Sequence, residues 1–253
     1  MLELIRQLLG TQLRFLAFQP VRPDLRRQRR AWLAYVLVVT WLVGIGRYWD
    51  HPRAELWQYA GLGSLAYIGL LSLFVYLLVL PLRPARWSYP MVLVFVGLTS
   101  LPALLYAIPV ERFTSLETAQ QLNVAFLGVV ATWRVALYVH FLRNAAALSW
   151  PATIVACLLP LCVIVVSLLA LNLEHVVFQI MAGIRDEDRS ANDDAYAVVF
   201  LLSMLATLCF PFVLAAYLVL TWLAWRYPRH AAGDQSAGAD TGGDELNQPR
   251  RIG

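Results

Sequence analysis

The stretch "YAGLGSLAYIGLLSLFVYLLVLPL", residues 59–82, contains no charged side chain. An α-helix rises about 1.5 Å per residue, so about 20 apolar residues cross the hydrocarbon core of a bilayer, which is roughly 30 Å thick. The stretch is long enough for that crossing, and Arg83 follows it directly. It therefore predicts a membrane-spanning helix.

The rest of the chain has the same character. Hydrophobic residues make up 60% of the sequence, charged residues make up 14%, and the mean hydropathy is +0.61. Soluble domains carry about 25% charged residues, so this composition excludes an ordinary soluble fold. We expect an all-α integral membrane protein, a bundle of about six transmembrane helices joined by short connections. The expected spans are residues 31–49, 59–82, 91–109, 122–142, 147–173 and 196–225.

Two other segments flank this transmembrane domain of residues 31–225. Residues 1–30 are expected to form an amphipathic and basic cytoplasmic segment. Residues 226–253 are rich in Gly, Ala, Asp and polar residues and hold few large apolar ones. Because such a composition cannot bury enough apolar surface to become ordered, we expect a disordered cytoplasmic tail.

The distribution of arginine predicts the orientation. Arginines gather before the first span, between the second and third, and after the fourth and sixth, whereas the opposite loops carry mainly Asp and Glu. Cytoplasmic segments near span ends are enriched in positive charge, so both termini are expected in the cytoplasm. The basic residues are all arginines, a bias typical of GC-rich bacterial genomes, so the expected location is a bacterial inner membrane.

The amino-terminal segment is expected to lie at the membrane surface. Its apolar residues recur at three- and four-residue steps, which places them on one face of an interfacial helix. These residues are Leu2, Ile5, Leu9, Leu13 and Leu16. The arginines of "QPVRPDLRRQRR", residues 19–30, predict binding to anionic lipid, where each cation contributes about 1 kcal/mol. The simpler interpretation is a topology signal alone.

Arg134 interrupts the fourth span, in "VVATWRVALYVHF", residues 129–141. A central arginine costs about 2.5–3.5 kcal/mol on insertion scales, and no Asp or Glu occurs in any of the six expected spans. Three kinds of partner remain: a backbone carbonyl, a bound anion such as a lipid phosphate or a carboxylate substrate, and water in a polar cleft. The second and third would give Arg134 a function beyond structure.

Prolines within the spans supply free carbonyls, because each proline removes a helical N–H and leaves the carbonyl four residues earlier without its partner. The prolines and the carbonyls they free are Pro102 with Leu98, Pro160 with Ala156, and Pro211 with Thr207. Polar residues near Leu98 and an indole next to Arg134 complete a candidate anion-binding site. Its residues are Arg134, Trp133, Thr99, Ser100 and Tyr106.

A second candidate site lies on the predicted outer face, where two loops carry imidazole and carboxylate groups. If the loops converge, these groups suit a metal ion of the His and carboxylate kind. The alternative is a helix start at Pro52, with Asp50 or His51 as the capping residue and Glu55 in the first turn. The candidate metal ligands are Asp50, His51, Glu55, Glu174 and His175.

No catalytic motif, phosphate-binding loop or cofactor motif is recognised, so an enzyme is the weaker class and no cofactor is expected. The leading hypothesis is a membrane-organising or accessory component that binds anionic lipid or another membrane protein, with no nucleic-acid partner. One alternative is a small transporter or lipid carrier that uses Arg134 as its anion anchor. The other is a metal-dependent enzyme acting at the outer face.

Overall fold

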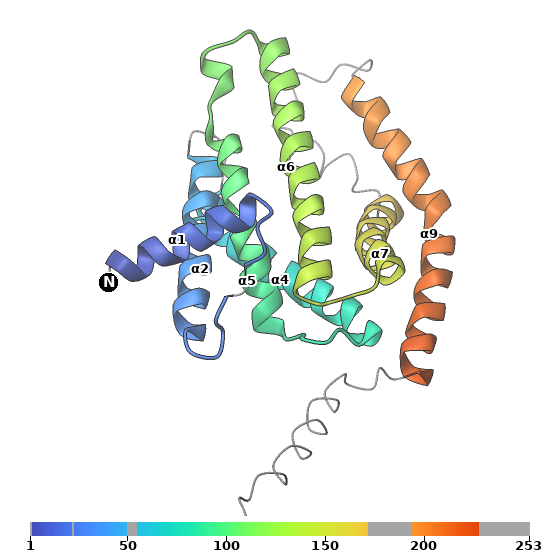
Figure 1. Ribbon diagram of the computed structural model, residues 1–253. Helices are drawn as coiled ribbons and strands as arrows, with labels where there is room; N and C mark the ends of the chain where they lie inside the picture. Colours follow the sequence, from blue (N-terminus) through green and yellow to red (C-terminus); the bar gives the residue numbers. More distant parts are fainter. Residues whose placement is uncertain (1, 22, 50–54, 172–193, 228–253) are drawn as a thin grey trace, which may run out of the picture.

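The computed structural model describes residues 2–21, 23–49, 55–171 and 194–227, and within these ranges all regular structure is helical. Figure 1 shows the helices. They are α1 (Leu2–Leu16), α2 (Arg29–Tyr48), α3 (Leu56–Tyr59), α4 (Leu62–Val79), η1 (Leu80–Leu82), α5 (Tyr89–Leu98), η2 (Leu101–Ala107), η3 (Val110–Arg112), α6 (Leu116–Asn144), α7 (Trp150–Ala170) and α9 (Asp194–Arg226).

The protein is an all-α membrane bundle. Five of the described helices, α2, α4, α6, α7 and α9, are long and apolar enough to cross a bilayer. The third expected span is not one helix: α5 and η2 are bent by 41° across a short break, and together they make a sixth span or a re-entrant segment. The predicted apolar segments therefore coincide with the helices, but residues 91–109 form a broken one. Most of the predicted tail, residues 228–253, lies outside the described residues.

The core lies where α2, α4, α5 and α6 meet. Phe95 of α5 stacks on Phe141 of α6, with ring centroids 4.1 Å apart. Gly97 lets α5 approach α2 closely, because a Cβ atom at this position would lie 2.5 Å from Val36 Cβ. Small residues at the contact points of membrane helices permit this approach of the backbones.

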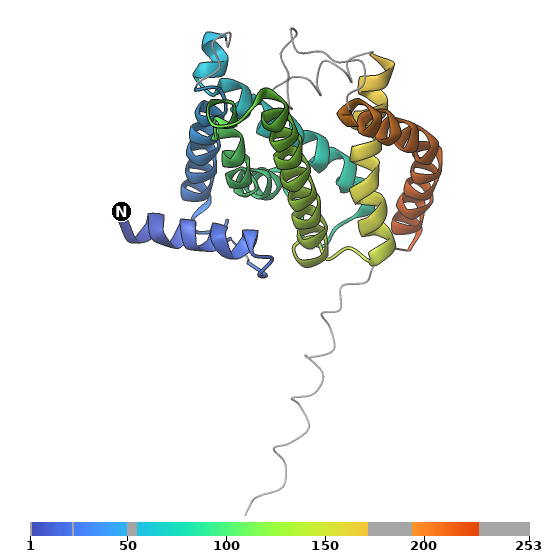
Figure 2. The same ribbon diagram turned by 90° about the horizontal axis from the view of Figure 1, so that it is seen from above.

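α1 lies across one side of the bundle, and in Figure 2 it runs along the edge at which α6 ends, whereas α3 lies at the opposite edge. The buried residues of α1 are Leu8, Gln12, Phe15 and Leu16. Of the apolar stripe indicated by the sequence, only Leu16 is buried. The other four members stay exposed, with Leu2 at 84%. The helix therefore has two adjacent apolar faces, one packed on the bundle and one uncovered.

Candidate functional site

The break between α5 and η2 leaves two backbone carbonyls without their helical donors. Pro102 has no N–H to give to Leu98 O, and the N–H of Ala103 donates to Ser100 O at 2.9 Å instead of to Thr99 O. An unpaired buried carbonyl is costly in an apolar surrounding. Both carbonyls accept hydrogen bonds from side chains of other helices.

Gln12 of α1 is the donor to the first carbonyl. Its Nε2 lies 2.9 Å from Leu98 O, and its Oε1 accepts a hydrogen bond of 2.6 Å from the Tyr35 hydroxyl of α2. The Gln12 side chain is completely buried. The amino-terminal helix therefore inserts an amide group between α2 and the broken helix.

Arg134 of α6 is the donor to the second carbonyl. Its Nε lies 3.0 Å from Thr99 O, one residue beyond the carbonyl that Pro102 frees. The side chain is half-buried, and among the residues that the structure describes no other hydrogen bond and no ion pair reaches its guanidinium group. The four N–H bonds of the two terminal nitrogens thus lack protein acceptors in that part of the chain.

The other members of the predicted anion-binding set lie around this break. The Thr99 hydroxyl donates to Val96 O at 2.7 Å. Ser100 is 3% exposed, and its hydroxyl has no partner within the described ranges. Tyr106 belongs to η2 and is half-buried. The structure therefore places Thr99 against Arg134, and no contact of the guanidinium with Ser100 or Tyr106 is seen among the described hydrogen bonds.

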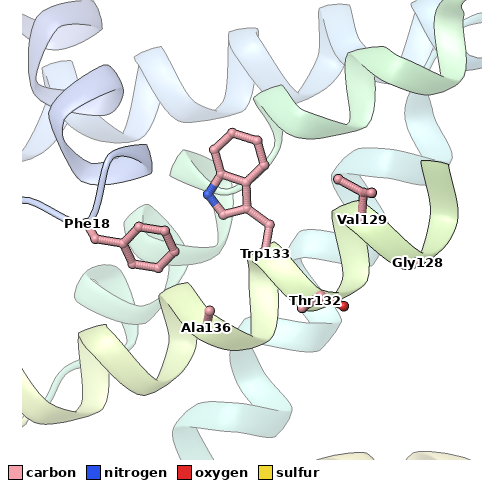
Figure 3. A pocket seen from close by; sticks show the side chains of 6 residues that line it. All are labelled: Phe18, Gly128, Val129, Thr132, Trp133 and Ala136. Carbon is pink, nitrogen blue, oxygen red and sulfur yellow. The ribbon is translucent and has the colours of Figure 1, made fainter. Parts of the chain in front are cut away.

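Trp133 contacts α1 and not the break. Its indole N–H donates to Leu16 O at 3.0 Å, at the last residue of α1. Its ring lines a mainly apolar hollow of about 480 Å³, and Figure 3 shows the side chains around this hollow. The hollow is lined by Phe18, Gly128, Val129, Thr132, Trp133 and Ala136. Because Arg134 is not among these residues, Trp133 and Arg134 do not face one common site.

Two capping residues were missed in the sequence. Gln12 carries a detectable signal, since it is a polar residue placed among Leu8, Phe15 and Leu16 on one helical face. Tyr138 follows Arg134 by one turn of α6, and its hydroxyl donates at 3.2 Å to Ala156 O, the carbonyl freed by Pro160. That pairing depends on how α6 packs against α7, which a single sequence does not encode locally.

A second hollow, of about 620 Å³, lies between α1 and the segment that leads into α2. It is lined by Leu4, Arg26, Arg27, Gln28, Arg29, Arg30 and Ala31, which we call the arginine hollow. Its four arginines are exposed and have no ion pair or aromatic partner within the described part of the chain. Some other arginines lie over aromatic rings, as Arg83 does at 4.0 Å from the centre of the Trp225 ring.

Local structure holds the arginine hollow open. The Asp24 carboxylate accepts the backbone N–H groups of Arg26 and Arg27, both at 3.1 Å, which fixes the turn before α2. The N-cap of α2, Gln28, makes no side-chain cap, and the first turn holds no acidic residue. The first N–H groups of the helix thus add partial positive charge to that of the guanidinium groups.

The predicted metal site cannot be assembled from the described residues. Asp50, His51, Glu174 and His175 lie outside them. Glu55 is the N-cap of α3 and forms a capping box with Gln58, whose side chain accepts the Glu55 N–H at 2.7 Å. In the described ranges no group of three or more His, Cys, Asp or Glu residues could hold a metal ion. Glu55 is thus the N-cap itself, where the alternative interpretation had placed it in the first turn.

Comparisons with protein-family models, with curated proteins and with solved structures give no match for this chain. A function is therefore inferred from the geometry of its own residues. The arginine hollow and the capped break are the two arrangements available for that inference.

Proposed function

We propose that this protein is a non-enzymatic membrane-organising or accessory component that binds anionic phospholipid through its amino-terminal basic segment. The proposal includes a bacterial inner membrane as the location and cytoplasmic positions for both termini. The observation that carries it is the arginine hollow, where four guanidinium groups that have no partner among the described residues surround a space of about 620 Å³.

Charge complementarity supports an anionic headgroup as the occupant. Each arginine near an anionic leaflet contributes about 1 kcal/mol, so the four together favour binding by about 4 kcal/mol, or roughly a thousandfold. Guanidinium groups also bind phosphate oxygens in a bidentate manner, which a point charge does not. A topology signal alone requires positive charge but no hollow.

The neighbouring surface of α1 suits the rest of a lipid molecule. Leu4 of α1 lines the hollow, and the same helix carries the uncovered apolar stripe that includes Leu2 and Ile5. Acyl chains can cover that stripe while the headgroup meets the arginines. The alternative function, a transporter anchored at Arg134, has less support because Arg134 lines neither of the two hollows described above.

The test is native mass spectrometry of the whole protein released from nanodiscs that contain phosphatidylglycerol and phosphatidylcholine. The hollow variant carries Arg26→Gln, Arg27→Gln, Arg29→Gln and Arg30→Gln. A charge-matched control carries Arg86→Gln, Arg229→Gln, Arg250→Gln and Arg251→Gln.

We expect the wild type and the control to retain phosphatidylglycerol preferentially and the hollow variant to lose that preference. An equal loss in both variants would show a dependence on net charge alone and would contradict the proposal. Retention of a protein partner that displaces lipid from the wild type would favour a protein-binding role for the same surface.

A further inference from the structure

We infer that Arg134 binds the phosphate group of a phospholipid from the leaflet that contains α1, at a site separate from the arginine hollow. The inference does not depend on the proposed function, because the phosphate of a zwitterionic lipid serves as well as that of an anionic one.

The guanidinium group of Arg134 is only partly paired within the described part of the chain. Thr99 O accepts from Nε at 3.0 Å and so fixes the edge of the group that faces the break. A neutral carbonyl satisfies one donor but does not neutralise the charge. The terminal nitrogens have no partner in the described part of the protein, so their N–H groups are available to an anion.

The predicted spans supply no acidic counter-ion for Arg134. The candidate span that holds Arg134 runs from Gln121 to Asn144. None of the six apolar segments of the sequence contains Asp or Glu. An intramembrane arginine is expensive unless it meets an anion or reaches the headgroups, so an outside anion is the remaining way to neutralise it.

The depth of Arg134 in the membrane follows from its position beside α1. Trp133, next to Arg134 in the chain, donates to Leu16 O at the end of α1. α1 carries the exposed charged residues Glu3, Arg6 and Arg14 beside its apolar stripe, a pattern that places a helix in the interface and not in the hydrocarbon centre. In Figure 2, α1 runs along the edge at which α6 ends. Through the contact of its neighbour Trp133 with Leu16, Arg134 lies close to the end of α1 and to the lipid that surrounds this helix.

The donors left on Arg134 suit a phosphate group. A guanidinium group held at Nε presents its two terminal nitrogens, which together bind two phosphate oxygens in a bidentate arrangement. Phosphate is the anion that every phospholipid offers at the depth of an interfacial helix. Free inorganic phosphate has the same donor requirements but no acyl chains, so the two sources can be separated by experiment.

The experiment counts lipids that remain on the protein in native mass spectra from nanodiscs made of phosphatidylcholine alone. This lipid has no net charge, and the hollow variant shows how much of its retention depends on the arginine hollow. We expect one retained phosphatidylcholine in the wild type and in the Arg26, Arg27, Arg29 and Arg30 hollow variant, and about tenfold lower occupancy in Arg134→Gln. Arg134→Lys, which keeps the charge but loses Nε and the bidentate pair, should show intermediate occupancy.

Two controls keep the outcomes distinct. Addition of inorganic phosphate should not displace the lipid, and displacement would assign the site to a free anion and overturn the lipid proposal. Equal occupancy in wild type and Arg134→Gln would also overturn it. Thermal unfolding of each variant shows whether it is folded. If Arg134→Gln does not fold, the comparison of the wild type with Arg134→Lys, which keeps the charge, decides between the outcomes. Loss of phosphatidylglycerol preference only in the hollow variant would leave this site unaffected.

Discussion

Two membrane helices of this protein contain a buried proline, yet one breaks and the other continues. Between α5 and η2, Pro102 coincides with a change to 3₁₀ geometry and a bend of 41°, whereas α7 runs without interruption from Trp150 to Ala170 through Pro160. In α7 one carbonyl is freed, that of Ala156, and one neutral hydroxyl, from Tyr138, caps it. At the break two carbonyls are freed, and an amide and a guanidinium group cap them.

In this comparison, neighbouring helices supply more hydrogen-bond donors to the proline-containing helix that is more distorted. In α7 one donor matches the carbonyl freed by the proline, and at the break a second donor accompanies the change to 3₁₀ pairing. α6 contributes to both places, with Arg134 facing the break and Tyr138 facing α7 one turn later. α1 contributes only at the break, through Gln12.

The largest expected effect comes from removing the amide at the break. Gln12→Leu leaves Leu98 O without a donor and the Tyr35 hydroxyl without its acceptor, so we expect a loss of about 2–3 kcal/mol in the free energy of unfolding. Titration of the protein with SDS in mixed micelles measures it. Gln7→Leu, at an exposed position of the same helix, is the matched control. Equal stability of the two variants would contradict a capping role for Gln12.

A second prediction concerns the close packing beside the break. Gly97→Ala places a methyl group 2.5 Å from Val36 Cβ and forces α2 and α5 apart, with an expected cost of about 2 kcal/mol. Gly69→Ala in α4 is the control, because nothing lies within 4 Å of a Cβ atom there. The same unfolding titration compares them. A loss no greater in Gly97→Ala than in Gly69→Ala would contradict the close approach.

A third prediction weakens the other member of the comparison. Tyr138→Phe removes the hydroxyl that binds Ala156 O and should cost about 0.6–1 kcal/mol, the usual range for one hydrogen bond between membrane helices. Because a single neutral bond is lost, the effect should be smaller than that of Gln12→Leu. The reverse order of the two losses would remove the distinction between the broken and the continuous helix.

The smallest effect is a coupling between two changes. Pro102→Ala restores an N–H that competes with Gln12 for Leu98 O, so the cost of Gln12→Leu should fall by about 0.5–1 kcal/mol in this background. A double-mutant cycle on the unfolding free energies measures the coupling. Strict additivity would show that Pro102 does not create the need for the Gln12 cap.

The helical segments were accessible from the sequence because bilayer thickness sets a length that uncharged runs either reach or miss. Residues 59–82 and 147–173 are uncharged runs long enough to span the bilayer, and the helices α4 and α7 lie within them. The break in residues 91–109 was less accessible, since Pro102 indicates a carbonyl to be capped but does not say whether the helix bends or ends.

The partners at the break were beyond sequence reasoning for a different reason. Gln12 and Leu98 are 86 residues apart, and only the docking of α1 on the bundle brings them together. The apolar stripe of α1 was identified, yet most of it is the uncovered face, because Leu8, Gln12 and Phe15 make the packed one. With two adjacent apolar faces, periodicity alone does not select the one that is buried.

The docking of α1 on the broken helix is the central claim, and cysteine cross-linking in native membranes tests it most directly. Phe15 and Phe95 have ring centroids 5.7 Å apart, so the pair Phe15→Cys and Phe95→Cys, in a chain whose Cys157, Cys162 and Cys209 are replaced by alanine, should form an intramolecular cross-link with a short bismaleimide. The pair Ile5→Cys and Phe95→Cys is the control, because Ile5 lies on the uncovered face of α1. Efficient linkage of the first pair and not the second is the result that the account predicts. No linkage of Phe15→Cys above the control would show that α1 leaves the break uncapped and would contradict it.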